Sequence, residues 1–168
     1  MRNIQNKYKF VSSENLFGLT IFAPEIQIIL KYCSNSNSKE TGGILIGHYS
    51  QEHNMAIVTR ISGPPEDSQS GSYFFLRGIK GLQQILNRLW YQKEYYIGEW
   101  HFHPYAAPIP SNTDHQQMVE FSCDKSMKCP EPILLIIGGN PNAEWSIKVI
   151  VYPKSQKALE LAEMPQPN

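Results

Sequence analysis

The sequence predicts an α/β or α+β domain in which about three helices flank one mostly antiparallel or mixed β-sheet. Three segments repeat apolar residues at helical spacing or begin with a helix-capping pattern, and short apolar or β-branched runs alternate with them. The chain has 168 residues, 41% of them hydrophobic and 18% charged, which is enough to bury one core of ordinary size. We therefore expect a single domain over residues 1–168.

The first predicted helix spans residues 24–34 and follows a strand. Its apolar residues recur at i, i+3, i+4 and i+7, as on one face of a helix, and Pro24 suits a first helical turn. The residues of this face are Ile26, Ile29, Leu30 and Cys33. A polar loop over 34–38 ends the helix, and the apolar runs 42–50 and 55–62 then predict paired strands.

The middle of the chain contains a break, a strand-like run and a second helix. Residues 63–71 are rich in glycine, proline and polar residues and predict a loop, whereas the aromatic run 73–76 is strand-like. Helical spacing predicts a helix over about 79–92, and a strand from Tyr95 to His103 follows it. The apolar residues that carry this spacing are Leu82, Ile85, Leu86 and Leu89.

The last third begins with a Pro-rich turn over 104–110. Ser111 and Asp114 then match a capping box, which opens a helix reaching about residue 123. Residues 132–138 and 145–152 predict two strands joined by a hairpin-type turn. We expect a short helix or a frayed end from Lys154 onward.

Composition excludes several classes of function. Fifteen basic residues balance fifteen acidic ones, which leaves no overall positive field to attract nucleic acid or an anionic membrane. The apolar runs are far shorter than the roughly 20 residues of a membrane span, and the N-terminus lacks the apolar core of a signal peptide. Three cysteines are an odd number, which argues against a disulfide framework. We therefore expect a soluble, cytoplasmic protein with reduced thiols.

One cluster of residues has the composition of a metal site. His101 and His103 are two apart at the end of an apolar strand, so both imidazoles face one side. Asp114, at the start of the next helix, can supply a third ligand and leave a fourth tetrahedral position for water, as in catalytic zinc sites. The alternative is a pair of strand-end histidines beside a capping-box acid. Capping accounts for Asp114 but not for two histidines on one face.

Three segments in order carry a family resemblance. Glu40 precedes the strand Gly-Gly-Ile-Leu-Ile-Gly at 42–47, His-Phe-His-Pro follows at 101–104, and Pro-Ser-Asn-Thr-Asp occupies 110–114. Together they resemble the JAMM (JAB/MPN+) zinc metalloprotease family over roughly residues 17–153. The resemblance implies an MPN/JAB-like three-layer domain. It also implies one zinc ion per chain.

The resemblance implies a role for each matching residue. His101, His103 and Asp114 correspond to the zinc ligands, and Glu40 corresponds to the acid/base that handles the water on zinc. Ser111 corresponds to the hydrogen-bond donor to the oxyanion, although it can also serve as an N-cap. Phe102 stands where the family often has a small or hydroxylated residue, and strand alternation predicts that it points into the core.

Other features resemble the stand-alone prokaryotic JAB branch, which includes deconjugating peptidases of antiphage operons. They are Gly98-Glu99-Trp100, Arg77-Gly78 and the loop 63–68. Family members cleave after the C-terminal glycine of ubiquitin-like proteins, and activating (E1-like) and conjugating (E2-like) enzymes are encoded nearby. The extended tail adds as a strand. The groove for it would involve residues 63–71 or the run from Tyr73.

Alternative functions follow from other sequence features. A catalytically silent MPN scaffold would be expected to lack a ligand or Glu40, and a third possibility is a peptidase for small peptides or cysteine conjugates. A second metal site at Cys123, Cys129 and His115 is one possibility. We favour the other, which is that the cysteines are ordinary thiols. The chain has neither an H-E-x-x-H helix nor the paired motifs of zinc deaminases.

Overall fold

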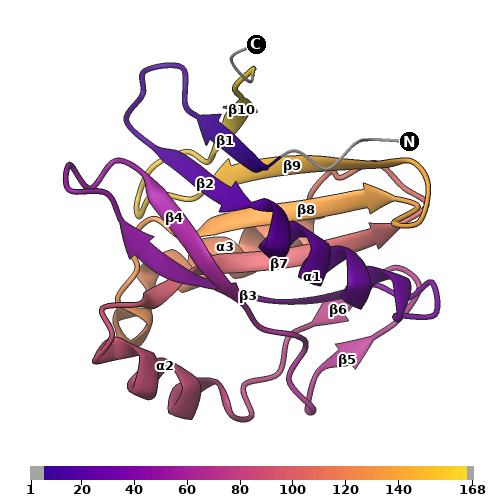
Figure 1. Ribbon diagram of the computed structural model, residues 1–168. Coiled ribbons are helices and arrows are strands. Elements are labelled where there is room, and N and C mark those ends of the chain that lie inside the picture. The colour runs from indigo at the N-terminus through magenta and orange to yellow at the C-terminus, as the bar shows by residue number, and fades with distance from the viewer. Residues whose placement is uncertain (1–5, 166–168) are drawn as a thin grey trace.

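The computed structural model describes residues 6–165, in which eight strands form a closed barrel (Figure 1). The order around the barrel is β1-β10-β9-β8-β7-β3-β4-β2, and β1 pairs with β2 to close it. Neighbours are antiparallel except β2 with β4 and β7 with β8. The strands are β1 (Lys7–Val11), β2 (Gly18–Phe22), β3 (Thr41–Tyr49), β4 (Ala56–Ile61), β7 (Tyr95–Pro104), β8 (Ile133–Gly139), β9 (Trp145–Val151) and β10 (Leu159–Glu163).

Three α-helices cover the two faces of this sheet. They are α1 (Ala23–Ser34), α2 (Leu82–Trp90) and α3 (Asn112–Cys123), and a 3-10 turn follows at Lys125–Met127. Helix α1 packs on the inner face, whereas α2 and α3 pack on the outer face. The predicted α+β class with a mixed sheet, three helices and three layers is therefore confirmed. The closure of the sheet was not expected.

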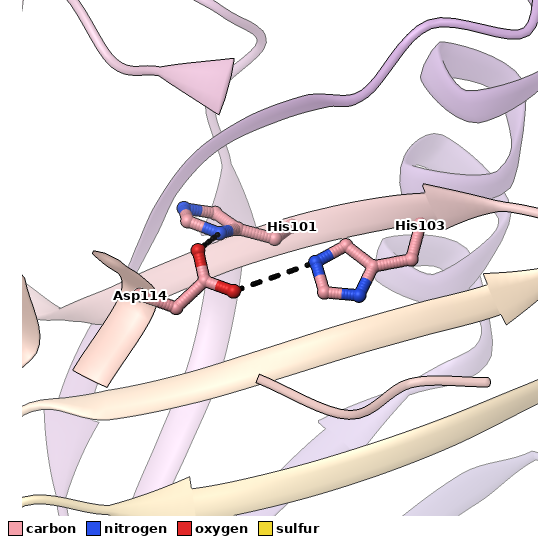
Figure 2. Close-up of side chains that lie close together, drawn as sticks. All are labelled: His101, His103 and Asp114. Atoms are coloured by element: carbon pink, nitrogen blue, oxygen red, sulfur yellow. Dashed lines mark hydrogen bonds and ion pairs between the residues drawn. The ribbon is translucent and has the colours of Figure 1, made fainter. Parts of the chain in front are cut away.

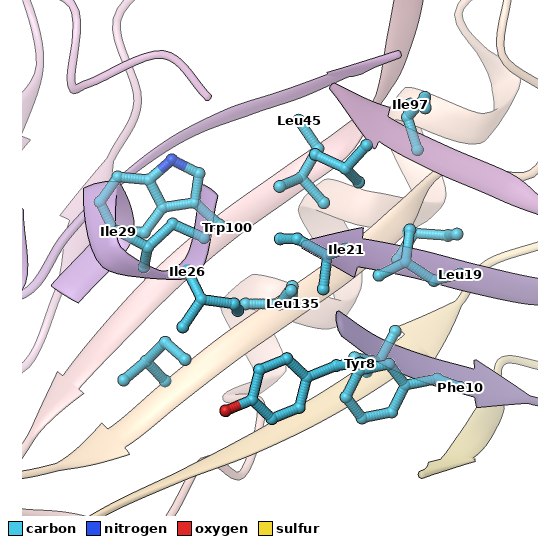
Figure 3. Close-up of a cluster of buried hydrophobic side chains, with 14 of the residues drawn as sticks. Tyr8, Phe10, Leu19, Ile21, Ile26, Ile29, Leu45, Ile97, Trp100 and Leu135 are labelled. Atoms are coloured by element: carbon cyan, nitrogen blue, oxygen red, sulfur yellow. The ribbon is translucent and has the colours of Figure 1, made fainter. Parts of the chain in front are cut away.

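The main core lies between α1 and the inner face of the barrel (Figure 3). All four apolar positions predicted for this helix are buried. Strand alternation separates the faces of the sheet: Leu45 packs in the inner core, whereas Ile44 and Ile46 pack outward against α2. The inner core is aromatic as well as aliphatic, with Trp100 and Phe102 facing inward from β7.

Replacing Ile29 by alanine is expected to lower the free energy of unfolding by about 2–5 kcal/mol. The reason is that Ile29 is 0% exposed, so the substitution leaves a cavity between α1 and the sheet. Its neighbour Ile28 is 42% exposed on the same helix, and Ile28→Ala should change stability by less than about 0.5 kcal/mol. Chemical denaturation of both variants measures the difference. Equal losses would contradict the assignment of the buried face.

The C-terminal tail corrects one prediction. Residues from Lys154 were expected to form a short helix or a frayed end, but Leu159–Glu163 forms strand β10, which pairs with β9 and β1. The local sequence Leu-Glu-Leu-Ala-Glu contains good helix formers. Pairing with two open strand edges outweighs this preference, because it satisfies backbone hydrogen-bonding groups on both sides.

A separate two-stranded ribbon lies outside the barrel. It pairs β5 (Gln69–Ser70) with β6 (Phe75–Leu76), so the predicted loop 63–71 contributes a short strand. The predicted strand over 73–76 keeps only its last two residues, because residues 71–74 form the connection between β5 and β6. Gly71 and Phe74 share a backbone hydrogen bond across this connection.

The three cysteines are free, as the sequence predicted, with Cys33 and Cys129 buried and Cys123 exposed. Burial raises the pKa of the Cys129 thiol to about 11, so this thiol is not reactive at neutral pH. Over residues 6–165, none of the helices has the length and apolar character that crossing a bilayer requires.

Candidate metal centre

Strand β7 places both histidines on the outer face of the sheet. The residues between and before them, Phe102 and Trp100, belong to the inner core, so His101 and His103 alternate with them and point outward. The prediction that Phe102 is a core residue is thus confirmed. Both histidines are buried, at 2% and 8% exposure. This burial keeps most water away from the imidazoles.

Helix α3 delivers Asp114 to the same place. Ser111 is its N-cap, and its Oγ accepts a hydrogen bond from the Asp114 backbone N–H at 3.1 Å. Asp114 Oδ2 accepts one from the Ser111 backbone N–H at 2.7 Å, which completes the predicted capping box. Ser111 is exposed, and its hydroxyl proton is not used by this cap. The cap fixes Asp114 in the first turn of the helix.

The carboxylate of Asp114 lies between the two imidazoles (Figure 2). Asp114 Oδ1 is 3.1 Å from His101 Nδ1, and Oδ2 is 3.5 Å from His103 Nε2. One ligand atom from each residue lies within 4.8 Å of the others. Capping and convergence on the histidines are therefore simultaneous properties of Asp114.

The electrostatics of the cluster follow from this contact. Burial would raise the pKa of Asp114, but the hydrogen bonds with His101 and His103 outweigh it and hold the pKa well below its ordinary value. Burial would lower the pKa of His103, yet Asp114 and the nearby charge of Glu40 raise it. Asp114 is therefore ionised across the whole physiological range.

The cluster fits a metal ion by an unpartnered buried atom and by the chemistry of its donors. His101 Nε2 is buried with no hydrogen-bond partner among the described residues. Two imidazoles and one carboxylate suit zinc and similar transition metals. Within residues 6–165, no other His, Cys, Asp or Glu group of this kind gathers, so the second site at Cys123, Cys129 and His115 does not form.

Glu40 stands beside the cluster without joining it. It directly precedes β3, whose register pairs Thr41 with Phe102 and so sets Glu40 opposite His103. Its carboxyl is half-buried, and burial, with a smaller contribution from Asp114, raises its pKa although His103 opposes the change. The five residues expected at the site, Glu40, His101, His103, Ser111 and Asp114, therefore lie in one region.

Sequence reasoning missed the contacts behind the cluster. Glu99 lies two residues before His101 on the same face, is 0% exposed and pairs with Arg77. Phe75 of the ribbon lies edge-on to the His101 ring, with centroids 5.5 Å apart. A single signal could have found the pair: an acid inside an otherwise apolar strand needs a partner.

A barrel with helices on both faces and a buried His-His-Asp cluster defines a JAMM-type peptidase domain, and comparison with known proteins agrees. The family model of prokaryotic homologues of the JAB domain matches residues 23–148. The chain belongs to this prokaryotic JAB family, which confirms the resemblance seen in the sequence. The match spans every residue of the cluster as well as Glu40 and Ser111.

Individual relatives bear out the same class. A "CD-NTase/cGAS isopeptidase" of Enterobacter hormaechei subsp. hoffmannii is 35% identical over 155 residues, which cover 92% of this chain and 86% of the relative. "Probable metalloprotease y4qB" of Sinorhizobium fredii is 28% identical over 145 residues, covering 83% and 87%. The solution structure of a protein from Desulfitobacterium hafniense shares the fold, with a TM-score of 0.58 at 17% identity over 84% of this chain and 86% of that one. The buried cluster and the metalloprotease relative together fit a metal site.

Proposed function

We propose that this protein is a zinc-dependent isopeptidase or peptidase that cleaves after the C-terminal residue of an extended protein tail. The observation that carries the proposal is the buried cluster of His101, His103 and Asp114 with Glu40 beside it. In this proposal the three clustered residues hold one zinc ion. A silent scaffold would have no need for a carboxyl group with a raised pKa next to an intact ligand set.

The chemistry is divided among the residues of the site. Zinc, when bound, acts as a Lewis acid and lowers the pKa of water toward about 7. Glu40 takes a proton from the attacking water and later delivers it to the leaving amine, a transfer helped by burial of its carboxyl, which raises its pKa. Ser111, whose Oγ already accepts a hydrogen bond from the Asp114 N–H, donates a hydrogen bond through its own O–H to the oxygen of the attacked carbonyl.

The surroundings of the site suit an extended peptide. Within the described residues the closed barrel has no free edge, whereas each short strand of the β5–β6 ribbon has a partner strand on one side alone. Its apolar side chains are exposed beside the site, with Tyr73 at 93%, Phe74 at 50% and Leu76 at 45% exposure. Tyr105 and Ile109 are exposed on the loop that joins β7 to α3. We propose that the substrate tail lies along the ribbon as an added strand.

The family resemblance and the names of the relatives suggest which proteins carry the substrate tail. A ubiquitin-like modifier ending in glycine is the substrate that the family resemblance implies, while two relatives carry the name CD-NTase/cGAS isopeptidase. We propose conjugates of one of these two protein classes as substrates, formed by E1-like and E2-like enzymes in an antiphage system. Genes for such enzymes beside this one would identify the partner.

A cleavage assay with three substrates tests the proposal. The zinc-loaded protein is incubated with a ubiquitin-like protein and with a CD-NTase, each joined through its C-terminus to a folded partner, and with short peptides. Cleavage of one folded conjugate after its C-terminal residue is the expected result. Cleavage of the peptides alone would indicate a small-peptide enzyme. If the protein bound no stoichiometric zinc and cleaved none of the substrates, the result would favour the catalytically silent scaffold.

A further inference from the structure

The ribbon packs on β7 through two contacts that have the same spacing on both segments. Phe75 packs edge-on against the His101 ring at an interplanar angle of 86°, and Arg77 pairs with Glu99, its Nε lying 2.6 Å from Oε2. Each pair of residues is two apart on its own segment, so both contacts fall on matching faces. The ribbon and strand β7, which carries His101 and His103, are therefore joined at two successive positions.

The contact between Arg77 and Glu99 is buried, and both side chains make further hydrogen bonds. The side chains of Arg77 and Glu99 are 4% and 0% exposed. Arg77 Nη1 also donates to the Gly78 carbonyl at 2.7 Å, and the Tyr96 hydroxyl donates to Glu99 Oε1 at 2.7 Å. The guanidinium carbon lies 5.1 Å from the ring centroid of Phe121 on α3. Arg77 thus contacts both elements that carry the clustered ligands, β7 and α3.

A local irregularity of β7 makes this arrangement possible. The β3–β7 register shifts between Leu45, which pairs with Gly98, and Ile46, which pairs with Tyr96. This bulge leaves one residue of β7 unpaired, so Tyr96 and Glu99 reach the same face although they are three residues apart. Bulges of this kind re-aim side chains and are frequent next to active sites.

Stability alone is a poor reason for such a pair. Removing two charges from water is costly, and replacing a buried ion pair by apolar groups of similar volume is often neutral or stabilising. What a buried, fully hydrogen-bonded pair does supply is a defined relative position of the elements that it joins. Here those elements are the ribbon, the strand with His101 and His103, and the helix with Asp114.

We propose that Arg77 and Glu99 are positioning residues that hold the ribbon, and with it the backbone partner of Glu40, against the metal-ligand strand. The link to Glu40 is direct: its backbone N–H donates to the Gly71 carbonyl at 2.8 Å, and Gly71 lies at the turn of the ribbon. A ribbon that moves away from β7 therefore takes with it the backbone partner of Glu40. The positional role stands on geometry, and only its catalytic consequence rests on the proposed function.

The test replaces both members of the pair, Arg77→Met together with Glu99→Gln, so that no buried charge is left alone. Hydrogen exchange of the Glu40 and Gly71 amides in the zinc-loaded protein is expected to become at least about 10-fold faster, while strand β8 stays protected. Turnover of the conjugate should fall by about 10²-fold in kcat with zinc content unchanged, since a displacement of about 1 Å has effects of this size.

A matched control uses the exposed pair at the base of the ribbon. Lys80 and Glu66 are 67% and 81% exposed, and Lys80→Met with Glu66→Gln likewise replaces a basic residue by Met and a glutamate by Gln without touching β7. This variant should keep wild-type exchange and turnover. Unchanged exchange at Glu40 and Gly71 in the Arg77/Glu99 variant would overturn the proposal, whatever the substrate proves to be.

A conservative variant covers the case in which the double variant does not fold. Arg77→Lys keeps the charge next to Glu99 but loses the planar fork that also reaches the Gly78 carbonyl. It should show exchange at Glu40 between that of the wild type and that expected of the double variant. Wild-type exchange and turnover in Arg77→Lys would show that the fork has no positional role and would equally overturn the proposal.

Discussion

Replacing Glu40 by glutamine is expected to lower kcat by a factor of about 10²–10⁴ while zinc remains bound. Glutamine keeps the size of the side chain and the backbone contact with Gly71, but it cannot take a proton from water. Because Glu40 stands outside the three-residue cluster, its loss removes no ligand. Steady-state turnover of the conjugate and elemental analysis of the same preparation measure the two effects separately.

Glu131 provides the matched control for this substitution. It is half-buried like Glu40, and burial raises its pKa too, but it precedes β8 at the end remote from the cluster. Glu131→Gln should retain wild-type turnover. If Glu40→Gln turned over substrate at the wild-type rate, Glu40 would not be the general base.

Replacing His103 by alanine is expected to remove the metal and, with it, all measurable turnover. Loss of an outer hydrogen-bond partner of a ligand costs roughly 10–100-fold in metal affinity, and loss of the ligand itself should cost more. Asp114 would keep its contact with His101 and its place in the capping box, so α3 should remain folded. Zinc content after dialysis and circular dichroism spectra test the two statements.

The corresponding control is His48→Ala. His48 is exposed near the far end of β3, so its loss should alter neither zinc content nor turnover. Full zinc occupancy in the His103 variant would contradict the ligand set. A loss of zinc in both variants would point instead to metal bound nonspecifically at surface histidines.

Much of the candidate site could be predicted because it depends on local rules. The two-residue spacing of His101 and His103 fixes a shared face in any strand, and the capping box places Asp114 in the first turn of α3. Their meeting needed only that the strand and helix be neighbours in the chain. The position of Glu40 came from family resemblance, because the β3–β7 register that sets it opposite His103 is not encoded locally.

The parts that could not be predicted depend on long-range pairing. Strand β10 forms from a segment with helical preference because β1 and β9 offer it two edges, and neither edge is visible in its own sequence. The Arg77–Glu99 contact joins two segments whose approach depends on the ribbon and on a bulge. Only Glu99 indicated such a contact in the sequence, since a charged residue in an apolar strand needs a partner.

The pairing of β1 with β10 has a consequence for how the chain folds. These strands come from opposite ends of the described residues, so the ladder between Phe10 and Glu163 closes a loop that spans nearly all of them. Loop closure of this length is entropically costly and slows folding. Until β10 is in place, β1 and β9 remain open edges that another chain could join. Strand β10 therefore covers two strand edges that would otherwise be open to pairing with another chain.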